Sequence, residues 1–317
     1  MRVFVAGASG AIGRRLVPAL VARGHRVTAT TRTPQKVELL HALGAEPVIV
    51  DGLDAVRVGE AVARAEPDAI VHQMTALTGI ADLKHFDRVF ATTNELRTKG
   101  TDHLLAAATA SGVERVVVQS YTSWPNIREG GAIKTEHDPL DPTPPAEQTQ
   151  SLAAIRHLED AVMAAPLQGI ALRYGSFYGP GELDPIVDMV RKRKLPIIGD
   201  GAGIWSWVHL DDAAAATVAA LESDARGVYN VVDDEPAPVS QWLPYLAELV
   251  GAKPPRHVPV WLGRLAGGEV GVSMMTQIRG SSNAKAKREL GWQPSWPSWR
   301  DGFRAALTEP EQRAAAA

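Results

Sequence analysis

The sequence predicts an α/β protein, a doubly wound parallel sheet followed by a smaller C-terminal lobe. Up to residue 174 the chain repeats one unit: a short β-branched run, a turn and a longer segment with helical spacing. Runs as apolar as Val116-Val117-Val118 belong to strands covered on both faces, and helices between such strands require parallel pairing. Beyond Tyr174 the regularity ends, because Gly and Pro crowd residues 175–185 and four Trp fall within 261–299.

Each element is assigned from its local pattern. The predicted strands span 3–6, 26–30, 47–50, 69–72, 115–120 and 170–174. The predicted helices span about 14–23, 35–43, 55–65, 86–110 and 151–164. Pro18 lies inside the first helix, where it removes a hydrogen bond, so we expect a kink or a displaced helix start.

The change of pattern divides the chain into two expected units. The larger comprises 1–174 and about 205–232, because the stretch near 207–232 is expected to return to the sheet. The smaller comprises about 175–204 and 233–317. The boundary is therefore discontinuous.

Composition excludes several classes of protein. The chain has 317 residues, of which 45% are hydrophobic and 22% charged, and it contains no Cys, so disorder, a disulfide scaffold and thiolate catalysis are excluded. Its net charge of -3 provides no broad basic field for nucleic acid or anionic lipid. No signal peptide or membrane-spanning run is recognisable, and the nine His lack metal-ligand spacing. We expect a cytoplasmic protein without nucleic-acid, membrane or metal partners.

The first strand runs directly into a glycine-rich turn, residues 7–13 with the sequence GASGAIG, and then into a helix. A backbone without Cβ lets a pyrophosphate approach, and the helix directs free N–H groups and its positive dipole end toward it. The pattern is typical of a Rossmann-type dinucleotide site, the alternative being an ordinary tight turn. The expected cofactor contacts are Gly7, Ser9, Gly10, Ala11, Ile12 and Gly13.

The end of the second strand favours NADP(H) over NAD(H). An NAD site usually has Asp or Glu there to bind the ribose 2′-hydroxyl, whereas this chain reads Thr30-Thr31-Arg32. Arg32 and Arg14 have the planar geometry that pairs with a phosphate. The alternative is that both arginines are simply solvated.

Taken together, these motifs resemble the extended short-chain dehydrogenase/reductase superfamily, specifically its NAD-dependent epimerase/dehydratase group. The resemblance rests on the order and spacing of GASGAIG (7–13), VIVDGLD (48–54), KGTDHLLAAA (99–108), VVVQS (116–120), LRYGSFYGPG (172–181), WVHLDDAAAA (207–216), YNVVDDEP (229–236) and KAKRELGW (285–292).

The resemblance implies further cofactor contacts. Asp51 is expected at the adenine with Leu53 nearby, and the turn 72–76, which contains Gln73, beside the ribose and pyrophosphate. The backbone from Tyr174 to Ser176 is expected beside the nicotinamide. The superfamily often pairs through long helices, so a homodimer is possible through those predicted at 86–110 and 151–164.

The sequence departs from the superfamily at its catalytic pair, a Tyr followed four residues later by Lys. No Tyr of this chain has that neighbour; by position Gln148 replaces the Tyr and Leu152 the Lys, while Tyr121 falls at or beside the usual Ser or Thr. Three explanations remain open: Tyr121 supplies the proton, another group in the pocket supplies it, or the chain binds the cofactor without catalysing a reaction. The catalytic candidates are Tyr121, Ser120 and Tyr178, with packing as the alternative for both tyrosines.

A tyrosine without a neighbouring Lys keeps its proton at pH 7. We therefore expect any chemistry at Tyr121 to run better as carbonyl reduction than as alcohol oxidation.

Two positions argue against a nucleotide-sugar substrate. Relatives that bind such sugars usually have Asn where this chain has Ser176, and Arg-Asp where it has Trp205-Ser206. An indole in place of a guanidinium removes a phosphate clamp and adds an apolar plane. Ser123, Trp205 and Trp207 are the substrate-binding candidates, with the alternative that both Trp fill the core between the lobes.

The sequence thus predicts an NAD(P)(H)-dependent oxidoreductase that transfers hydride to a small carbonyl-type, non-nucleotide substrate. Two alternatives remain open: a nucleotide-sugar epimerase or dehydratase, and a non-catalytic regulator that senses NADP(H).

Overall fold

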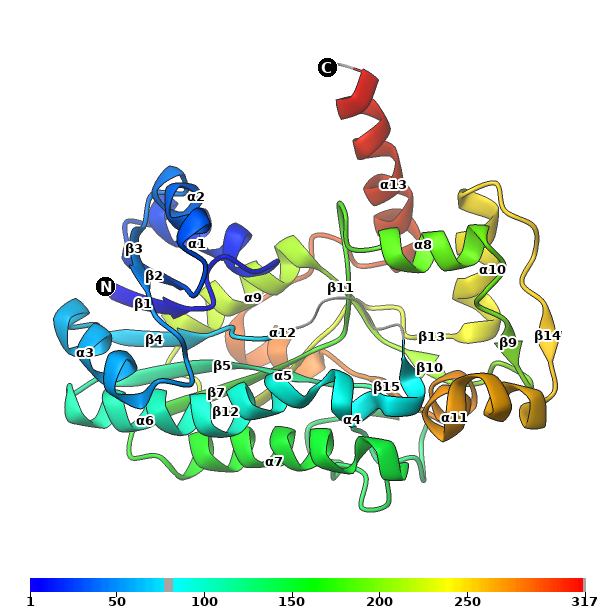
Figure 1. Ribbon diagram of the computed structural model, residues 1–317, viewed down its shortest axis with the longest axis horizontal. Helices are drawn as coiled ribbons and strands as arrows, with labels where there is room; N and C mark the ends of the chain where they lie inside the picture. The colour runs from blue at the N-terminus through cyan, green and yellow to red at the C-terminus, as the bar shows by residue number, and fades with distance from the viewer. Residues whose placement is uncertain (77–81, 316–317) are drawn as a thin grey trace.

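The computed structural model describes residues 1–76 and 82–315, except the side chains of 309–315. A seven-stranded sheet forms its centre, in the order β12-β7-β5-β4-β1-β2-β3, and every pair in it is parallel (Figure 1). The strands are β1 (Arg2–Ala6), β2 (Arg26–Thr31), β3 (Glu46–Ile49), β4 (Ala69–His72), β5 (Arg115–Tyr121), β7 (Gln168–Tyr174) and β12 (Gly227–Val231). The six strands predicted from the sequence are confirmed, each within two residues at either end.

Strand order reverses between β1 and β4. The chain runs from β1 outward to β3 on one side, then returns to place β4, β5 and β7 on the other. Ligands of doubly wound sheets bind at this switch point, outside the carboxyl ends of the strands.

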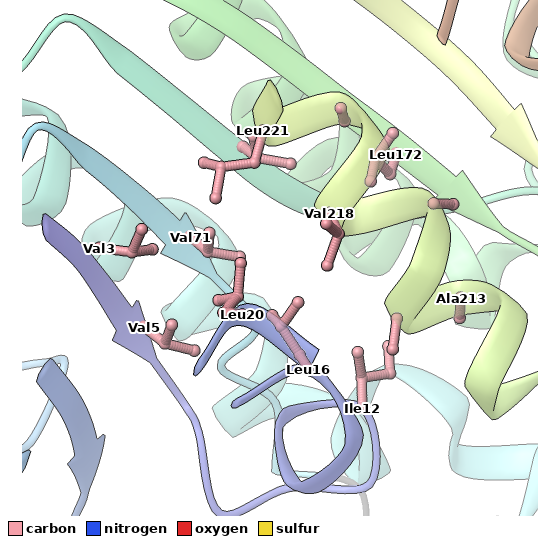
Figure 2. Packing of buried hydrophobic residues seen from close by; sticks show 14 of the residues in the cluster. Val3, Val5, Ile12, Leu16, Leu20, Val71, Leu172, Ala213, Val218 and Leu221 are labelled. Atoms are coloured by element: carbon pink, nitrogen blue, oxygen red, sulfur yellow. The ribbon is translucent and has the colours of Figure 1, made fainter. Parts of the chain in front are cut away.

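Helices cover both faces of the sheet, which confirms the doubly wound prediction. On one face α1 (Gly13–Ala22), α9 (Leu210–Glu222) and α12 (Ala284–Leu290) pack in a single apolar cluster. In this cluster Leu16 and Leu20 of α1 lie between Val5 of β1 and Val218 of α9 (Figure 2). The opposite face is covered by α3 (Ala55–Ala65), α6 (Thr101–Ala110) and α7 (Thr149–Ala164).

Two predicted helices are divided, and the displaced start expected from Pro18 is not observed. The helix expected at 35–43 begins as the 3₁₀ turn η1 (Pro34–Lys36) and continues as α2 (Val37–Ala42). The helix expected at 86–110 is divided into α4 (Phe86–Val89), α5 (Ala91–Glu95), a π-helical turn η3 (Leu96–Gly100) and α6. Helix α1 begins at Gly13 and runs through Pro18, so the proline does not displace its start.

A second apolar cluster lies beyond the carboxyl ends of the strands. Trp207, Trp242 and Phe303 meet there with ring centroids about 5 Å apart, and all three are buried. β12 returns to the main sheet as expected. Among the described residues β11 (Trp207–His209) pairs with β8 (Ser176–Tyr178) and not with the main sheet, and Trp207 and Tyr178 of the two strands are both buried in this second cluster.

The remaining elements are short connections or belong to this second cluster. They are η1 (Pro34–Lys36), α2 (Val37–Ala42), η2 (Leu83–His85), β6 (Ile133–Lys134), η4 (Ala146–Gln148), α8 (Asp184–Arg191), β9 (Ile197–Ile198), β10 (Ile204–Trp205), β13 (Ala237–Pro238), α10 (Val239–Leu249), β14 (His257–Val258), α11 (Val260–Thr276), β15 (Gly280–Ser281) and α13 (Trp299–Ala315).

Within residues 1–76 and 82–315, no helix is long and apolar enough to cross a membrane. The same residues contain no cluster of three or more His, Asp or Glu suited to a metal ion.

Candidate functional site

A cleft of about 440 Å³ opens at the switch point, and it collects most of the cofactor residues predicted from the sequence. It is lined by Gly7, Ser9, Gly10, Ala11, Ile12, Gly13, Arg14, Arg32, Asp51 and Gln73. Leu53, Tyr174 and Ser176 were also predicted but are not among its lining residues. A larger hollow of about 740 Å³ lies at the opposite edge, where Arg2 pairs with Glu66 and Asp68.

The three glycines of the turn serve three different purposes. Gly7 has φ of +85°, and a Cβ there would lie 2.7 Å from the Gln73 backbone. A Cβ on Gly13 would lie 2.3 Å from the Ala8 carbonyl, so this glycine lets α1 pack closely on the strand. A Cβ on Gly10 would meet only Gly7 O, at 3.3 Å, so the protein itself does not require glycine at this position. The open space beside Gly10 fits an approaching phosphate.

Two further observations fit a dinucleotide in this cleft. Among the described residues no side chain caps the N-terminus of α1; Arg14 N and Arg15 N donate to Gly10 O and Ile12 O, and the positive end of the helix dipole is directed at the glycine turn. Gln73 is 5% exposed; its amide nitrogen donates to the Tyr174 hydroxyl at 3.3 Å, but its carbonyl oxygen has no partner among those residues. A buried acceptor of this kind suits a ligand hydroxyl.

Three cations surround the end of β2. Arg14, Arg32 and Lys36 all line the cleft and are exposed, and no hydrogen bond or ion pair with described residues engages their charged groups. Lys36 escaped the sequence analysis, although it stands only four residues after Arg32 in a turn that begins with Pro34. The arrangement is that of an anion site.

Asp51 follows β3 and lines the cleft, where its carboxylate accepts a hydrogen bond from Leu53 N at 3.1 Å. Leu53 therefore lies beside the cleft as the partner of Asp51. Gly52, Met74 and Leu96 complete the wall here. This end is more apolar than the end that holds the three cations.

His72 ends β4 as a structural residue. Burial lowers its pKa to about 4, so the ring is neutral at pH 7. Its Nδ1 accepts from Met74 N at 3.1 Å, which leaves the protonated Nε2 to donate to the Leu96 carbonyl at 3.3 Å. Both ring nitrogens are thus occupied in holding the turn.

Tyr121 ends β5 beside the predicted nicotinamide segment. Its hydroxyl lies 2.8 Å from Ser176 Oγ, and burial raises the pKa of the phenol while Ser176 and Arg97 lower it, leaving it above the usual value. The phenol therefore keeps its proton at pH 7. Gln119, two residues earlier and on the same face of the strand, lines the cleft, which the sequence analysis did not anticipate.

Ser120 points to the opposite face of β5. Its hydroxyl donates to Glu159 Oε1 at 2.6 Å, and the same carboxylate accepts two bonds from the Arg173 guanidinium at 2.6–2.7 Å. Side chains alternate along a strand, so Ser120 lies on the face opposite Gln119 and Tyr121; neither Ser120 nor Tyr121 is among the residues that line the cleft. The expected catalytic role of Ser120 is therefore replaced by a buried structural contact.

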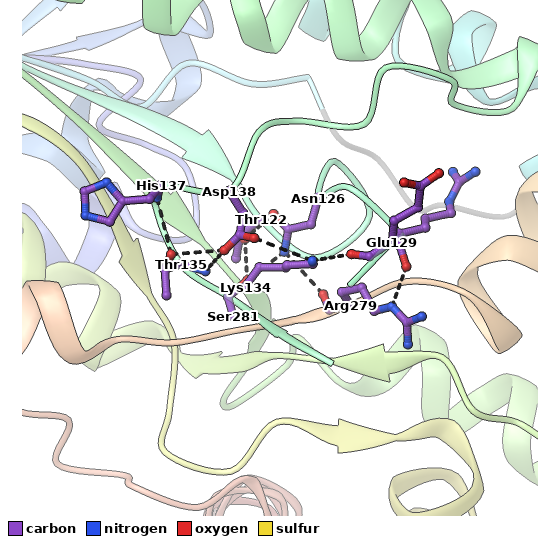
Figure 3. A network of polar contacts seen from close by, with 10 residues as sticks. Thr122, Asn126, Glu129, Lys134, Thr135, His137, Asp138, Arg279 and Ser281 are labelled. Carbon is purple, nitrogen blue, oxygen red and sulfur yellow. Dashed lines mark hydrogen bonds and ion pairs between the residues drawn. The ribbon is translucent and has the colours of Figure 1, made fainter. Parts of the chain in front are cut away.

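The loop after β5 is fixed by a polar network with β15. Asn126 Nδ2 donates to Ser281 Oγ at 2.9 Å, and Ser281 Oγ lies 2.6 Å from Thr122 Oγ1 (Figure 3). Ser123 has φ of +79°, and its hydroxyl accepts from Ser206 N at 3.3 Å. The hydroxyl oxygen of Ser123, a predicted substrate contact, is therefore already hydrogen-bonded to the backbone. Lys134 pairs with Asp138 at 3.5 Å and does not reach the cleft.

The other aromatic candidates lie in the second cluster. Tyr178 is fully buried, its hydroxyl donates to the Trp296 carbonyl at 3.3 Å, and burial raises its pKa. Trp207 is also fully buried, and Trp205 donates to the Met274 carbonyl at 3.0 Å. These positions match the alternative of interlobe packing, because Tyr178 and Trp207 are buried members of this cluster and Trp205 packs against it.

The positions of the missing catalytic pair hold groups that cannot replace it. Leu152 is buried against Trp124 and Phe86 in an apolar cluster. Gln148 is fully buried, and neither atom of its amide has a partner among the described residues. Neither side chain carries a transferable proton near pH 7.

Known proteins resemble this chain at the levels of family, sequence and fold. The model of the NAD dependent epimerase/dehydratase family matches residues 3–232. A 3-diazoavenalumate denitrifying reductase from a Streptomyces species is 43% identical over 96% of this chain and 99% of its own length. A 2-alkyl-3-oxoalkanoate reductase from Stenotrophomonas maltophilia is 30% identical over 80% of this chain and 76% of its own length.

Solved structures share the fold. The UDP-glucose 4-epimerase of Thermotoga maritima with UDP-glucose has a TM-score of 0.77 at 22% identity, covering 99% of this chain and 100% of its own. The NAD complex of the Thermus thermophilus UDP-glucose 4-epimerase has a TM-score of 0.74 at 25% identity, covering 97% of this chain and 98% of its own.

Proposed function

This chain belongs to the NAD-dependent epimerase/dehydratase family, and from that premise we propose that it is an NADP(H)-dependent reductase of a small acceptor without a nucleotide. In this proposal residues 1–174 and about 205–232 bind the cofactor, and the remainder forms the acceptor lobe. The cofactor contacts are the cleft residues of the glycine turn with Arg14, Arg32, Asp51 and Gln73.

The three unpaired cations at the end of β2 carry the cofactor proposal. A ribose 2′-phosphate brings two negative charges to this point, and two guanidinium groups and an ammonium suit it by charge and geometry. Among the residues that line the cleft, none at the end of β2 is a carboxylate that would repel this phosphate. Asp51 and Glu182 also line the cleft, but they follow other elements of the chain.

When bound, the cofactor supplies a hydride, and what the chain must add depends on the acceptor. A ketone that accepts hydride becomes an alkoxide and needs a proton, for which Tyr121 is the candidate donor. A diazonium group, R–N₂⁺, accepts hydride and becomes R–H and N₂, with no proton consumed and no oxyanion formed.

The residues present favour the diazonium reaction. Gln148 and Leu152 stand where the family's Tyr and Lys would be, so a ketone would depend on Tyr121 alone for its proton. The Streptomyces relative is named as a denitrifying reductase of a diazo compound and aligns with nearly the whole chain. Carbonyl reduction with Tyr121 as donor is the second candidate, supported by the 3-oxoalkanoate reductase.

Both relatives are named for acceptors that are anions of carboxylic acids. The acceptor that we propose therefore carries a carboxylate as well as the reducible group.

The test follows NADPH oxidation by the purified protein with 3-carboxybenzenediazonium and with 3-oxobutanoate, set against reactions without protein. We expect the diazonium to consume NADPH and release N₂ in equal amounts. In the variant Arg32→Ser the KM for NADPH should rise about tenfold while that for NADH stays constant, because one charge-assisted contact is lost.

Other outcomes would contradict the proposal. UDP-sugar epimerisation without net cofactor consumption would favour an epimerase. Tight NADPH binding without oxidation by either acceptor would favour a sensor.

A further inference from the structure

Arg97 is a buried cation without a counterion. It lies in the π turn η3, its side chain is 5% exposed, and its Nη1 is buried with no hydrogen-bond partner among the described residues. No carboxylate of those residues lies within ion-pair distance of it. π-helical turns interrupt the regular ladder of a helix and are frequent at functional sites.

The one buried acid near Arg97 is already neutralised. Glu159 attracts Arg97 electrostatically, but its two carboxylate oxygens accept from Arg173, at 2.7 and 2.6 Å, and from Ser120 at 2.6 Å. Burial lowers the pKa of Arg97 to about 10, so the guanidinium is still charged at pH 7. The region therefore holds one positive charge that the described chain does not balance.

Other unpaired polar atoms lie on the neighbouring helices. Asn94, which lies on α5 three residues before Arg97, donates its Nδ2 to Ser151 Oγ on α7 at 3.0 Å, while its Oδ1 has no partner among the described residues. Gln148, one turn before Ser151, has a wholly unpaired amide within the same set. The segments that hold Arg97, Asn94 and Gln148 all pack against α7. Buried polar groups are normally paired, so unpaired atoms on three such residues indicate a ligand.

The position of Arg97 matches the reaction end of the site. Arg97 interacts electrostatically with Tyr121, which is bonded to Ser176, and its π turn packs against α7, the helix that holds Leu152. The cations suited to cofactor phosphate, Arg14 and Arg32, line the cleft at the other end. The anion that Arg97 lacks is thus expected on the acceptor.

We propose that Arg97 binds the carboxylate of the acceptor and thereby selects and orients acidic substrates. This inference rests on the proposed function, since it names the recognition group for the same acceptor. A guanidinium holds a carboxylate through two parallel N–H···O bonds, which fix direction as well as affinity. Asn94 and Arg97 lie in one segment of the chain and Gln148 in another, more than fifty residues later, so no continuous sequence motif contains all three.

The experiment titrates the protein saturated with NADP⁺ by calorimetry, using cinnamate and its neutral analogue cinnamamide as probes. We expect cinnamate to bind at least tenfold more tightly than cinnamamide to the wild type. Arg97→Gln should weaken cinnamate about ten- to a hundredfold and leave cinnamamide within about twofold, the loss of a charge-assisted bond. Arg97→Lys should keep part of the preference.

The matched control is Lys99→Gln. Lys99 lies in the same π turn, but its side chain is 64% exposed and paired with Glu95, so its loss should leave both probes unchanged. If Arg97→Gln does not fold, the ratio of the wild-type affinities for cinnamate and cinnamamide and the same ratio in Arg97→Lys still test the proposal.

Three results would overturn the proposal. The first is equal affinity of the wild type for the two probes. The second is an acid preference that survives in Arg97→Gln. The third is a tenfold loss of NADP⁺ affinity in Arg97→Gln with the acid preference intact, which would assign the guanidinium to the cofactor. Arg97-dependent binding of cinnamate without NADPH oxidation by any acceptor would instead disprove the proposed function alone.

Discussion

Tyr121 separates the two acceptor chemistries at the scale of a single residue. Its phenol is held by Ser176 and its pKa is raised by burial, so at neutral pH it is protonated and can donate to an alkoxide, whereas the phenolate that would take a proton from an alcohol is scarce. The direction of this shift supports the expectation that the site favours reduction over oxidation.

Tyr121→Phe should therefore affect the two acceptors differently. Ketone reduction should fall about 10²- to 10⁴-fold, the usual contribution of general acid catalysis, while diazonium reduction should stay within about twofold. The measurement is kcat/KM for each acceptor with saturating NADPH. Equal losses with both would show that the residue positions the acceptor, and no loss with either would remove it from the chemistry.

The same residue predicts a pH dependence. Because the phenol's pKa lies above its ordinary value near 10, the wild type should keep its proton donor throughout the neutral range. A ketone-reduction rate that declined with an apparent pKa near 7 would identify another group as the donor.

At the scale of an element, the strand–turn–helix unit of β1 and α1 combines folding and binding requirements in adjacent glycines. Gly13 is needed for helix packing, whereas Gly10 leaves space that the protein does not fill. One substitution at each position can separate the two requirements.

Gly10→Ala should weaken NADPH binding at least tenfold and change the free energy of unfolding by less than about 1 kcal/mol, since its Cβ meets only one atom at 3.3 Å. Gly13→Ala serves as the contrast: its Cβ would lie 2.3 Å from a backbone oxygen and should cost about 1–3 kcal/mol of stability. Fluorescence titration and urea unfolding measure the two quantities. Unchanged NADPH affinity in Gly10→Ala would place the phosphate elsewhere.

At the scale of the whole molecule, His72 links stability to pH. It is neutral and buried in the folded state with a pKa of about 4, against an ordinary 6.5 in the unfolded chain. As the pH falls below 6.5, His72 binds a proton in the unfolded chain but not in the folded protein, so the free energy of unfolding decreases. The full effect is about 3 kcal/mol and is reached near pH 4.

The variant His72→Asn should lose less stability than the wild type between pH 7 and pH 4.5, as measured by urea unfolding. An asparagine oxygen can accept the Met74 N–H that Nδ1 accepts now. His41→Gln, at an exposed position on α2, is the control and should follow the wild type. Parallel pH curves for wild type and His72→Asn would show that other groups govern the acid sensitivity.

The division between prediction and structure follows the range of the interactions. The strands, the glycine turn and the arginines after it were predictable, because periodicity, turn chemistry and helix-end electrostatics act between residues close in sequence. Lys36 was predictable on the same grounds, because it lies only four residues after Arg32. By contrast, Ser120 and Tyr178 are held away from the cleft by hydrogen bonds to Glu159 and Trp296. These partners lie 39 and 118 residues away in the sequence.

By itself, then, the sequence determined the doubly wound sheet and the position of the dinucleotide turn, and it showed that the Tyr–Lys pair is missing. Only the tertiary structure decided which polar groups remain unpaired once the chain is packed. Arg97, Asn94 and Gln148 show this most clearly. Whether a buried charge has a counterion depends on distances between helices, and no pattern along the chain encodes them.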